Sequence, residues 1–258
     1  LFKNSSGVSS SLDPPEPMIA LITPKIIKPM IRSNMCLNAH PIGCVKDTER
    51  QINFVKAKKT DVCVEIGTGS GVISVLVNYK NKPQKIYAFE LQQKYADLAQ
   101  KNIELNSMQE QITVINSNIK DFKSYLSKEV DVVFCNPPYY KSGVCKQSES
   151  QDIAICKHES FLPLEDLIST ASKMLKFGGK LYFVYPANRL DEVIVELNKN
   201  NLQPKKIFFA QPTINKNANT VYLQCTKGGK YGVKILPTLI TNNMDGEYVQ
   251  TIQKLYKK

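Results

Sequence analysis

The chain has 258 residues, a formal net charge of +11 and 42% hydrophobic residues, an ordinary globular composition that excludes wholesale disorder. Its most apolar stretch, residues 17–31, is interrupted by two prolines and two lysines, so we expect neither a membrane span nor a signal peptide. The seven cysteines have no Cys-x-x-Cys spacing, and the chain has only two histidines, which argues against a disulfide framework and a zinc site. We therefore expect no bound metal and a cytoplasmic location.

Positive charge is concentrated toward the C-terminus. From Lys199 to Lys258 the sequence holds ten lysines and two acidic residues, so this segment carries +8 of the total +11. Such asymmetry is typical of a surface that faces phosphate groups, and it is also typical of a solvated lysine-rich face. The charge alone does not choose between the two.

Two regions differ in composition. Residues 1–55 contain a Ser/Gly-rich opening and many prolines, which predicts an atypical N-terminal segment that is partly flexible. Residues 56–258 alternate short β-branched runs with stretches of helical period. The expected strands are 62–66, 85–89, 112–115, 130–135 and 180–185, and the expected helices are 71–79, 92–106, 164–175 and 189–200. This alternation predicts βαβ units and a largely parallel sheet.

The pattern changes after Pro204. Residues 206–210, 220–225 and 232–240 predict strands that form an antiparallel end to the sheet. Phe177-Gly178-Gly179 predicts a helix stop just before the fifth strand.

A glycine-rich turn follows the first predicted strand. Gly67, Gly69 and Gly71 lie between this strand and a predicted helix, and glycine allows a tight turn and the close approach of a ligand. Glu90 ends the next strand, 23 positions after Gly67, where a carboxylate can accept hydrogen bonds from both hydroxyls of a ribose. The combination favours a nucleoside-cofactor site over a turn that binds nothing.

Two features favour an adenosyl cofactor over a dinucleotide. A dinucleotide site usually needs a third glycine in the pattern G-x-G-x-x-G, but position 72 is Val72. Glu65, inside the strand before the turn, suits the ammonium group of a methionine better than a pyrophosphate. We therefore expect S-adenosylmethionine as the cofactor.

A second motif, Asn136-Pro137-Pro138-Tyr139, follows the predicted strand 130–135. Its two prolines fix the backbone and remove two N–H donors, so the turn presents carbonyl acceptors. The asparagine adds a further acceptor and the tyrosine adds a flat face. Two acceptors and a stacking ring suit a planar amino group, because they orient its hydrogens and leave the nitrogen lone pair aimed at the cofactor methyl. The motif favours methyl transfer to an amino nitrogen.

These motifs resemble those of class I S-adenosylmethionine-dependent methyltransferases that modify amino nitrogens. Over about residues 56–250 the chain is similar to bacterial tRNA adenine-N6-methyltransferases that modify the adenosine adjoining the anticodon of a valine tRNA. The segments that carry this similarity are 136–140, Ile153-Ala154, His158-Glu159, Leu164-Glu165-Asp166-Leu167, 186–193, Lys227-Gly228-Gly229-Lys230 and Asp245-Gly246-Glu247-Tyr248.

The resemblance implies a Rossmann-like α/β methyltransferase domain over residues 56–258, with S-adenosylmethionine as cofactor and tRNA as substrate. We expect a seven-stranded, mostly parallel sheet with an antiparallel C-terminal strand and the site at the carboxyl ends of the strands. The residues expected to bind the cofactor are Glu65, Gly67, Thr68, Gly69, Gly71, Glu90, Leu91, Asn118, Ile119 and Asn136. Those expected to be catalytic are Asn136, Pro137, Pro138 and Tyr139, and those expected to contact RNA are Tyr139, His158, Lys227 and Lys230.

The sequence departs from the family pattern in two places. Asn118 stands where the family usually carries an aspartate, so weaker cofactor affinity is expected. The family's N-terminal segment, which helps close the cofactor site, is absent, and residues 25–55 instead resemble the start of bacterial trans-2-enoyl-CoA reductases. That family's dinucleotide loop and catalytic tyrosine region are missing. We therefore interpret residues 1–55 as a foreign N-terminus without reductase activity.

Two alternative functions stay open at this point. A protein-glutamine N5-methyltransferase acting on release factors could use the same turn to orient a carboxamide nitrogen, although the positive C-terminal charge and the His158-Glu159 match argue against it. An inactive RNA-binding remnant would fit the departure at Asn118 and the missing N-terminal lid. A monomer is favoured.

Overall fold

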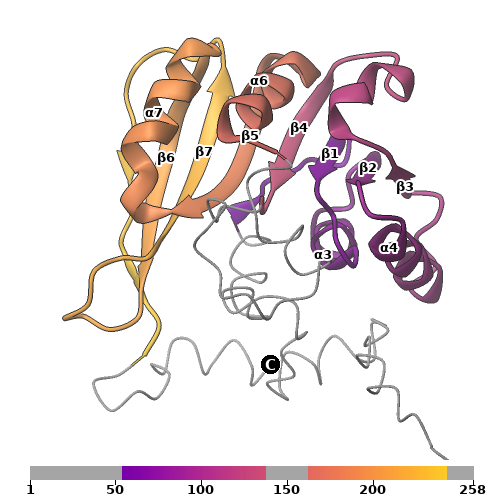
Figure 1. The fold of residues 1–258 in the computed structure, drawn as a ribbon, viewed down its shortest axis with the longest axis horizontal. Coiled ribbons are helices and arrows are strands. Elements are labelled where there is room, and N and C mark those ends of the chain that lie inside the picture. The colour runs from indigo at the N-terminus through magenta and orange to yellow at the C-terminus, as the bar shows by residue number, and fades with distance from the viewer. Residues whose placement is uncertain (1–53, 138–161, 243–258) are drawn as a thin grey trace, which may run out of the picture.

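A mixed β-sheet runs through the computed structural model, which describes residues 54–137 and 162–242 (Figure 1). The strands are β1 (Val62–Ile66), β2 (Lys85–Glu90), β3 (Ile112–Asn116), β4 (Val130–Cys135), β5 (Leu175–Pro186), β6 (Leu202–Gln211), β7 (Thr220–Lys227), β8 (Lys234–Ile235) and β9 (Leu239–Ile240). Their order is β3-β2-β1-β4-β5-β7-β6-β8, and β9 also pairs with β6. The helices are α3 (Val72–Asn81), α4 (Gln93–Leu105), α6 (Leu164–Met174) and α7 (Leu190–Lys199), with short 3-10 helices η1 (Ile119–Ser124) and η3 (Ala187–Arg189).

The direction of the strands confirms the expected fold class. β1 is parallel to β2 and β4, β2 to β3, and β4 to β5, whereas β7 is antiparallel to both β5 and β6. The expectation of seven strands was wrong for the described residues, where the sheet has nine. Residues 232–240 do not form one antiparallel strand: β8 and β9 are separate two-residue strands, both parallel to β6. Pro237 lies between them and has no N–H group to continue the ladder.

The expected helix stop before β5 was also wrong. α6 ends at Met174 and β5 begins at the next residue, five positions before the expected start. The pairing with β4 shifts within this stretch, because Val130 pairs with Leu175 but Val132 pairs with Lys180. Residues 176–179 therefore form an irregular bulge inside the strand, where Gly178 has a positive φ of 79°.

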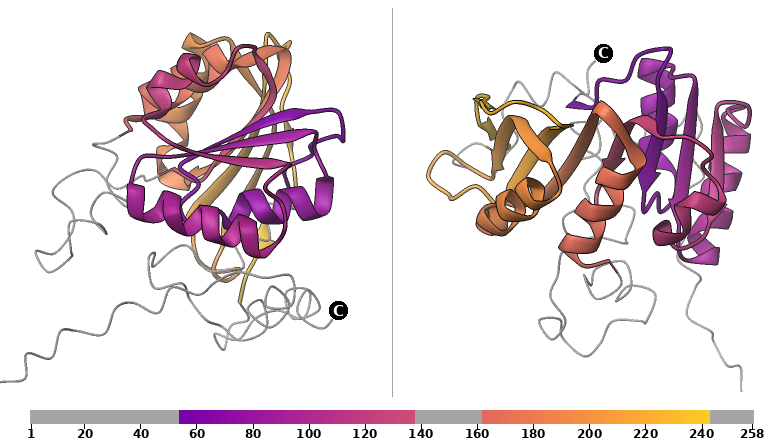
Figure 2. Two further views of the ribbon diagram at one scale, coloured as in Figure 1. Left: turned by 90° about the vertical axis from the view of Figure 1, so that its right-hand side faces the viewer. Right: turned by 90° about the horizontal axis from the view of Figure 1, so that it is seen from above.

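Helices cover the sheet on both faces (Figures 1 and 2). α3 and α4 lie on one face, and α6 and α7 on the other. Each of α6 and α7 has two acidic residues in its first turn and a lysine in its last turn, an arrangement that complements the helix dipole. Alternate residues of β1 and β4 enter two core clusters, with Val64 and Val133 on the α6 face and Cys63 and Val132 on the α3 face.

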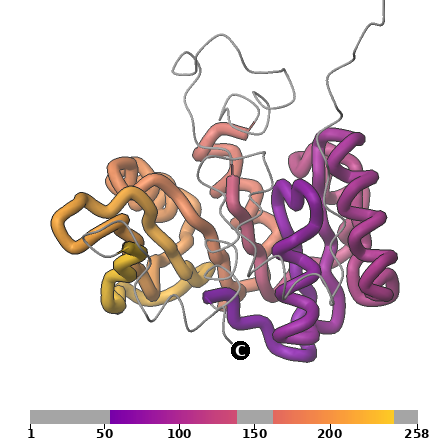
Figure 3. The backbone as a smooth tube through the Cα atoms, turned by 90° about the horizontal axis from the view of Figure 1, so that it is seen from below, coloured from indigo at the N-terminus to yellow at the C-terminus, as the bar shows by residue number. Residues whose placement is uncertain are grey.

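The loops that follow the parallel strands lie at one edge of the sheet. Every strand except β7 points toward the lower edge in Figure 1, which Figure 3 shows from below. This carboxyl edge collects the loops that follow β1, β2, β3 and β4, so it is where the fold class places a ligand. β7 runs the other way and ends at the opposite edge. None of the described helices is long and apolar enough to cross a membrane.

Candidate functional site

The glycine turn between β1 and α3 has the conformation that its sequence predicts. Gly67, Gly69 and Gly71 have φ values of 69°, 56° and 81°, a region that favours glycine. At Gly71 a Cβ atom would lie 3.2 Å from the Cα atom of Ala99, so the missing side chain lets α3 approach α4. At Gly67 and Gly69 no atom lies within 4 Å of that position. The turn therefore leaves open space in which a ligand can approach the backbone.

Glu90 lies at this turn, at the end of β2. One oxygen, Oε2, accepts a hydrogen bond from the backbone N–H of Gly69 at 2.9 Å, and Oε1 accepts one from the N–H of Gln92 at 3.0 Å. The residue is buried, and burial raises the pKa of its carboxyl group, while the N–H groups of Gln92 and Gly69 act in the opposite direction. The structure thus brings the ribose-binding candidate into direct contact with the glycine turn.

Glu65 lies beneath the turn rather than on its surface. Its side chain is completely buried, and Oε2 accepts hydrogen bonds from the hydroxyl groups of Thr68 and Ser74, the first at 2.6 Å. Burial raises the pKa of the carboxyl group to about 8, against the lowering effect of these hydrogen bonds. Oε1 is buried without a partner among the described residues. Glu65 therefore ties β1 to the turn and to α3, and Oε1 is the oxygen left for a cationic group.

Two asparagines that the sequence did not single out hold the loops of the site. Asn102 of α4 is fully buried and donates from Nδ2 to the carbonyl of Ser70 at 2.8 Å. Asn116, at the end of β3, donates from Nδ2 to the carbonyls of Glu90 and Leu91 at 3.0 and 3.2 Å. The one signal for Asn102 is its polar side chain among apolar neighbours in a helix, where asparagine is disfavoured.

The second motif lies beside the first. β1 and β4 are parallel, and their last paired residues are Ile66 and Cys135. Gly67 and Asn136 are the next residue of each strand, so the two turns leave the sheet side by side. Asn136 is half-buried and Pro137 is buried. The predicted site residues Pro138, Tyr139 and His158 lie outside the described residues.

The remaining cofactor candidates have different surroundings. Asn118 precedes η1, and its Oδ1 accepts a hydrogen bond from the N–H of Lys120 at 3.0 Å, so this oxygen caps the helix. Ile119 is buried, and its side chain belongs to the core cluster on the α6 face. Leu91, after Glu90, is 45% exposed and is the apolar side chain of this set that a ligand can contact.

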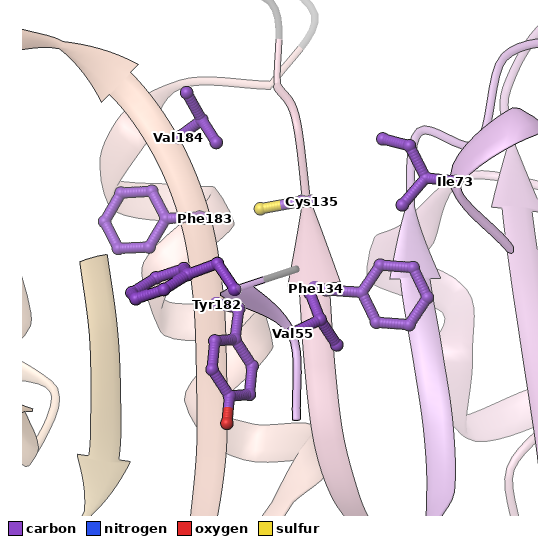
Figure 4. Close-up of a pocket in the computed structure, with 8 residues that line it drawn as sticks. Val55, Ile73, Phe134, Cys135, Tyr182, Phe183 and Val184 are labelled. Atoms are coloured by element: carbon purple, nitrogen blue, oxygen red, sulfur yellow. The ribbon is translucent and has the colours of Figure 1, made fainter. Parts of the chain in front are cut away.

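An apolar pocket adjoins the carboxyl ends of β4 and β5 (Figure 4). Its lining residues are Phe54, Val55, Ile73, Phe134, Cys135, Tyr182, Phe183 and Val184. It carries no charged side chain and does not include the glycine turn. Burial raises the pKa of the Cys135 thiol above its ordinary value, so this cysteine behaves as a small core residue.

Lys227 and Lys230 lie at the edge opposite Asn136, because β7 is antiparallel and ends at Lys227. The Lys227 Nζ atom donates to the carbonyl of Leu175 at 2.6 Å and lies 3.5 Å from the Glu129 carboxylate. The ammonium group of Lys227 therefore has partners within the fold, and its RNA-contact role stays a prediction. Lys230 is exposed.

Comparison with protein families identifies the domain. The model of the methyltransferase small domain matches residues 48–199. The chain belongs to this family. Membership in this methyltransferase family identifies S-adenosylmethionine as the methyl donor, as the glycine turn and Glu90 led us to expect.

Curated relatives of this methyltransferase carry one shared name, tRNA1(Val) (adenine(37)-N6)-methyltransferase. The protein from Flavobacterium psychrophilum is 26% identical over 144 residues, which cover 56% of this chain and 61% of the relative. That from Porphyromonas gingivalis is 28% identical and covers 51% and 52%. That from Aliivibrio salmonicida is 23% identical over 202 residues, or 75% and 81%. The matches to the first two span about half to three-fifths of the relatives' length.

Solved structures show the same fold. A predicted O-methyltransferase from Agrobacterium tumefaciens superposes with a TM-score of 0.64 at 17% identity, covering 81% of this chain and 95% of that protein. A methyltransferase from Pyrococcus furiosus gives a TM-score of 0.53 at 22% identity, covering 74% and 87%. At these identities the likeness concerns the fold alone.

The described residues fit the cofactor that the family uses. The open backbone at Gly67 and Gly69 leaves room for it, the Glu90 carboxylate adjoins that space, and the unpartnered Oε1 of Glu65 lies beneath it. Gly67, Gly69 and Glu90 would hold the adenosyl and methionine parts, and Leu91 offers an apolar contact. Bound there, the cofactor would supply an electrophilic methyl group.

Proposed function

We propose that this methyltransferase transfers a methyl group to the N6 amino group of an adenosine in tRNA, at the anticodon-loop position of a valine tRNA. The observation that carries the proposal is the register of β1 and β4, which sets Asn136-Pro137 directly beside the glycine turn. The shared name of the curated relatives supports the choice of substrate.

The residues of the second motif act on the amino group. The Asn136 side-chain oxygen and the carbonyl of Pro137 are acceptors for the two hydrogens of a planar amino group. Accepting both hydrogens directs the nitrogen lone pair out of the plane, toward the neighbouring glycine turn. The nitrogen becomes tetrahedral during attack, so the Asn136 acceptor matters most in the transition state. Most of the rate enhancement then comes from positioning.

The RNA must present its base out of the loop stack, which costs a few kcal/mol. Stacking on an aromatic ring returns about 1–3 kcal/mol per base, and Tyr139, which adjoins the motif in sequence, has the side chain for this. A histidine base is not needed before the attack, because the neutral amino nitrogen forms the new bond to the methyl carbon with its own lone pair. The nitrogen then carries a positive charge, which makes its N–H group acidic, and it releases one proton after the transfer.

Transfer of a labelled methyl group tests the proposal. Unmodified valine tRNA should be methylated, and the product nucleoside should be N6-methyladenosine. Asn136→Ala should nearly abolish kcat while the variant still binds the tRNA. Near-full turnover by Asn136→Ala would contradict the amino-orienting mechanism.

The same assay on a release factor examines the protein-glutamine alternative, which the names of the curated relatives do not favour. Methylation of the release factor without methylation of tRNA would replace the proposal. Cofactor binding without transfer to either substrate would indicate an inactive remnant.

A further inference from the structure

The strands at one end of the sheet come from a part of the sequence that contains lysines but no acidic residues. Between Glu196 and Asp245 there is no aspartate or glutamate, and seven lysines occupy this interval. Residues 202–240 of the interval form β6, β7, β8, β9 and their connections. The positive charge therefore gathers at the end of the sheet farthest from β3, on the left in Figure 1.

Three of these lysines have partners within the fold. Lys199 pairs with Glu196 at 2.6 Å, and Lys227 contacts the carbonyl of Leu175. The Nζ atom of Lys205 donates to the carbonyls of Lys230 and Gly232 at 3.0 and 2.7 Å, which fastens the segment after β7 to β6. The other four are exposed, and their ammonium groups make no hydrogen bond or ion pair with a described residue. They are Lys206, Lys216, Lys230 and Lys234.

Two of these four lie directly opposite each other. β6 and β8 are parallel, and Lys206 pairs in register with Lys234. Residues opposite each other in a sheet project from the same face, and like charges in that position destabilise the pairing. The described residues supply no acidic group to offset this repulsion, whereas a phosphate group placed between the two ammonium groups would.

The four lysines occupy different positions along the length of β6. Lys216 lies in the loop between β6 and β7, at the same carboxyl edge as Asn136. Lys206 and Lys234 lie near the middle of β6, and Lys230 follows the end of β7 at the other edge. β6 has ten residues and a length of about 33 Å, and Lys206 lies near its middle, so about half of that length separates Lys206 and Lys234 from the loop that holds Lys216. Tyr231, beside Lys230, is 89% exposed and offers an aromatic surface among the charges.

We propose that this lysine strip, formed by Lys206, Lys216, Lys230 and Lys234 with Tyr231, binds the phosphate backbone of the RNA stem next to the target loop. The proposal rests on the proposed function. The strip begins at the carboxyl edge, where the target base would enter, and lysine ammonium groups bind phosphates without reading sequence. Contacts along the strip hold the stem while Asn136 acts on the loop.

RNA binding measured against salt concentration tests the strip. The variant combines Lys206→Gln, Lys230→Gln and Lys234→Gln, and the matched control combines Lys58→Gln, Lys82→Gln and Lys101→Gln, which remove the same charge from exposed sites elsewhere. Fluorescence anisotropy with unmodified valine tRNA, from 50 to 200 mM salt, gives the slope of log Kd against log salt. The strip variant should lower the magnitude of this slope by about 2 to 3, since each of the three lost phosphate contacts removes about 0.7–0.9. The control should keep the wild-type slope.

Measuring the melting temperature of the strip variant shows whether a loss of RNA binding results from a loss of folding. The strip variant should melt at the wild-type temperature or above it, because it removes the repulsion between Lys206 and Lys234. A clear fall would show that these lysines stabilise the fold and would overturn the proposal, as would a wild-type slope in the strip variant. Loss of binding to phosphatidylserine vesicles with unchanged RNA binding would assign the strip to a membrane surface instead.

Methyl transfer separates this inference from the proposed function. If the salt slopes of the wild type and the strip variant differ as expected but the wild type transfers no methyl group to tRNA, the lysine strip is supported and the proposed activity is wrong. If the wild-type chain methylates tRNA while the strip variant binds it unchanged, the activity stands and the strip fails. With both correct, the strip variant shows a raised KM for tRNA and an unchanged kcat.

Discussion

Ile66 of β1 and Cys135 of β4 lie opposite each other at the last register position of the two parallel strands. The glycine turn and the Asn136-Pro137 turn therefore emerge side by side from the carboxyl edge. A slip of one residue in this register would move Asn136 by about 3.3 Å along the strand and turn its side chain to the other face. The pairing of two buried apolar residues thus sets the distance between the glycine turn and Asn136.

Replacing Glu90 should weaken cofactor binding. The carboxylate contacts the N–H of Gly69 and adjoins the open space at the turn. Glu90→Ala should reduce affinity for S-adenosylhomocysteine about 10- to 100-fold, since hydrogen bonds to a charged group contribute about 1.5–3 kcal/mol. Isothermal titration calorimetry measures this, with Glu104→Ala on the exposed side of α4 as the control. Equal affinities for the two variants would remove Glu90 from the site.

Substitutions at Gly71 and Gly67 should have different effects, the first mainly on the stability of the fold and the second mainly on cofactor binding. Gly71→Ala combines a positive φ with a contact of 3.2 Å to Ala99, and should lower the free energy of unfolding by about 2 kcal/mol. Gly67→Ala has the same strain but no neighbour within 4 Å, so it should destabilise less and yet weaken cofactor binding. Urea unfolding and calorimetry on both variants check the contrast. A Gly67→Ala variant that binds normally would place the cofactor elsewhere.

Glu65 should make stability depend on pH. Burial raises the pKa of its carboxyl group from 4.5 to about 8, so between these values the folded chain keeps a proton that the unfolded chain releases. The contribution of Glu65 to stability is therefore fully present below about pH 4.5 and is lost as pH rises to about 8, by up to about 1.4 kcal/mol per pH unit.

Glu65→Gln should remove that pH dependence, because glutamine does not titrate. The difference in unfolding free energy between wild type and Glu65→Gln should shift in favour of the variant from pH 5.5 to 8.5, as measured by urea unfolding. The exposed Glu104→Gln should give a curve parallel to that of the wild type. Parallel curves for Glu65→Gln as well would mean that Glu65 is ionised in the folded chain.

Lys227 and Lys230 should have different effects, although the sequence presents them as one motif. Lys227→Gln removes the contact between Nζ and the Leu175 carbonyl, and should lower the free energy of unfolding by about 1–2 kcal/mol. Lys230→Gln should leave stability unchanged, because its side chain is exposed. Thermal unfolding of the two single variants measures the difference. Equal stability would contradict the structural role of Lys227.

Local patterns in the sequence were enough to predict the fold class and the conformation of the glycine turn after β1. Local signals were sufficient there, because Gly67, Gly69 and Gly71 directly follow a β-branched run and glycine favours the positive φ of a tight turn. The alternation of strands and helices determined the parallel sheet for the same reason.

Contacts between distant parts of the chain showed which of the candidate residues have partners within the fold. Glu65 became a buried anchor and Lys227 a partner of Leu175 because β1 is central in the sheet and β7 runs against its neighbours. Both kinds of contact join positions that are far apart in the chain: the hydrogen bond between Asn102 and Ser70, and the pairing of Lys206 with Lys234 across two strands. No local pattern carries such contacts, because their energy depends on the register and direction of the neighbouring strands.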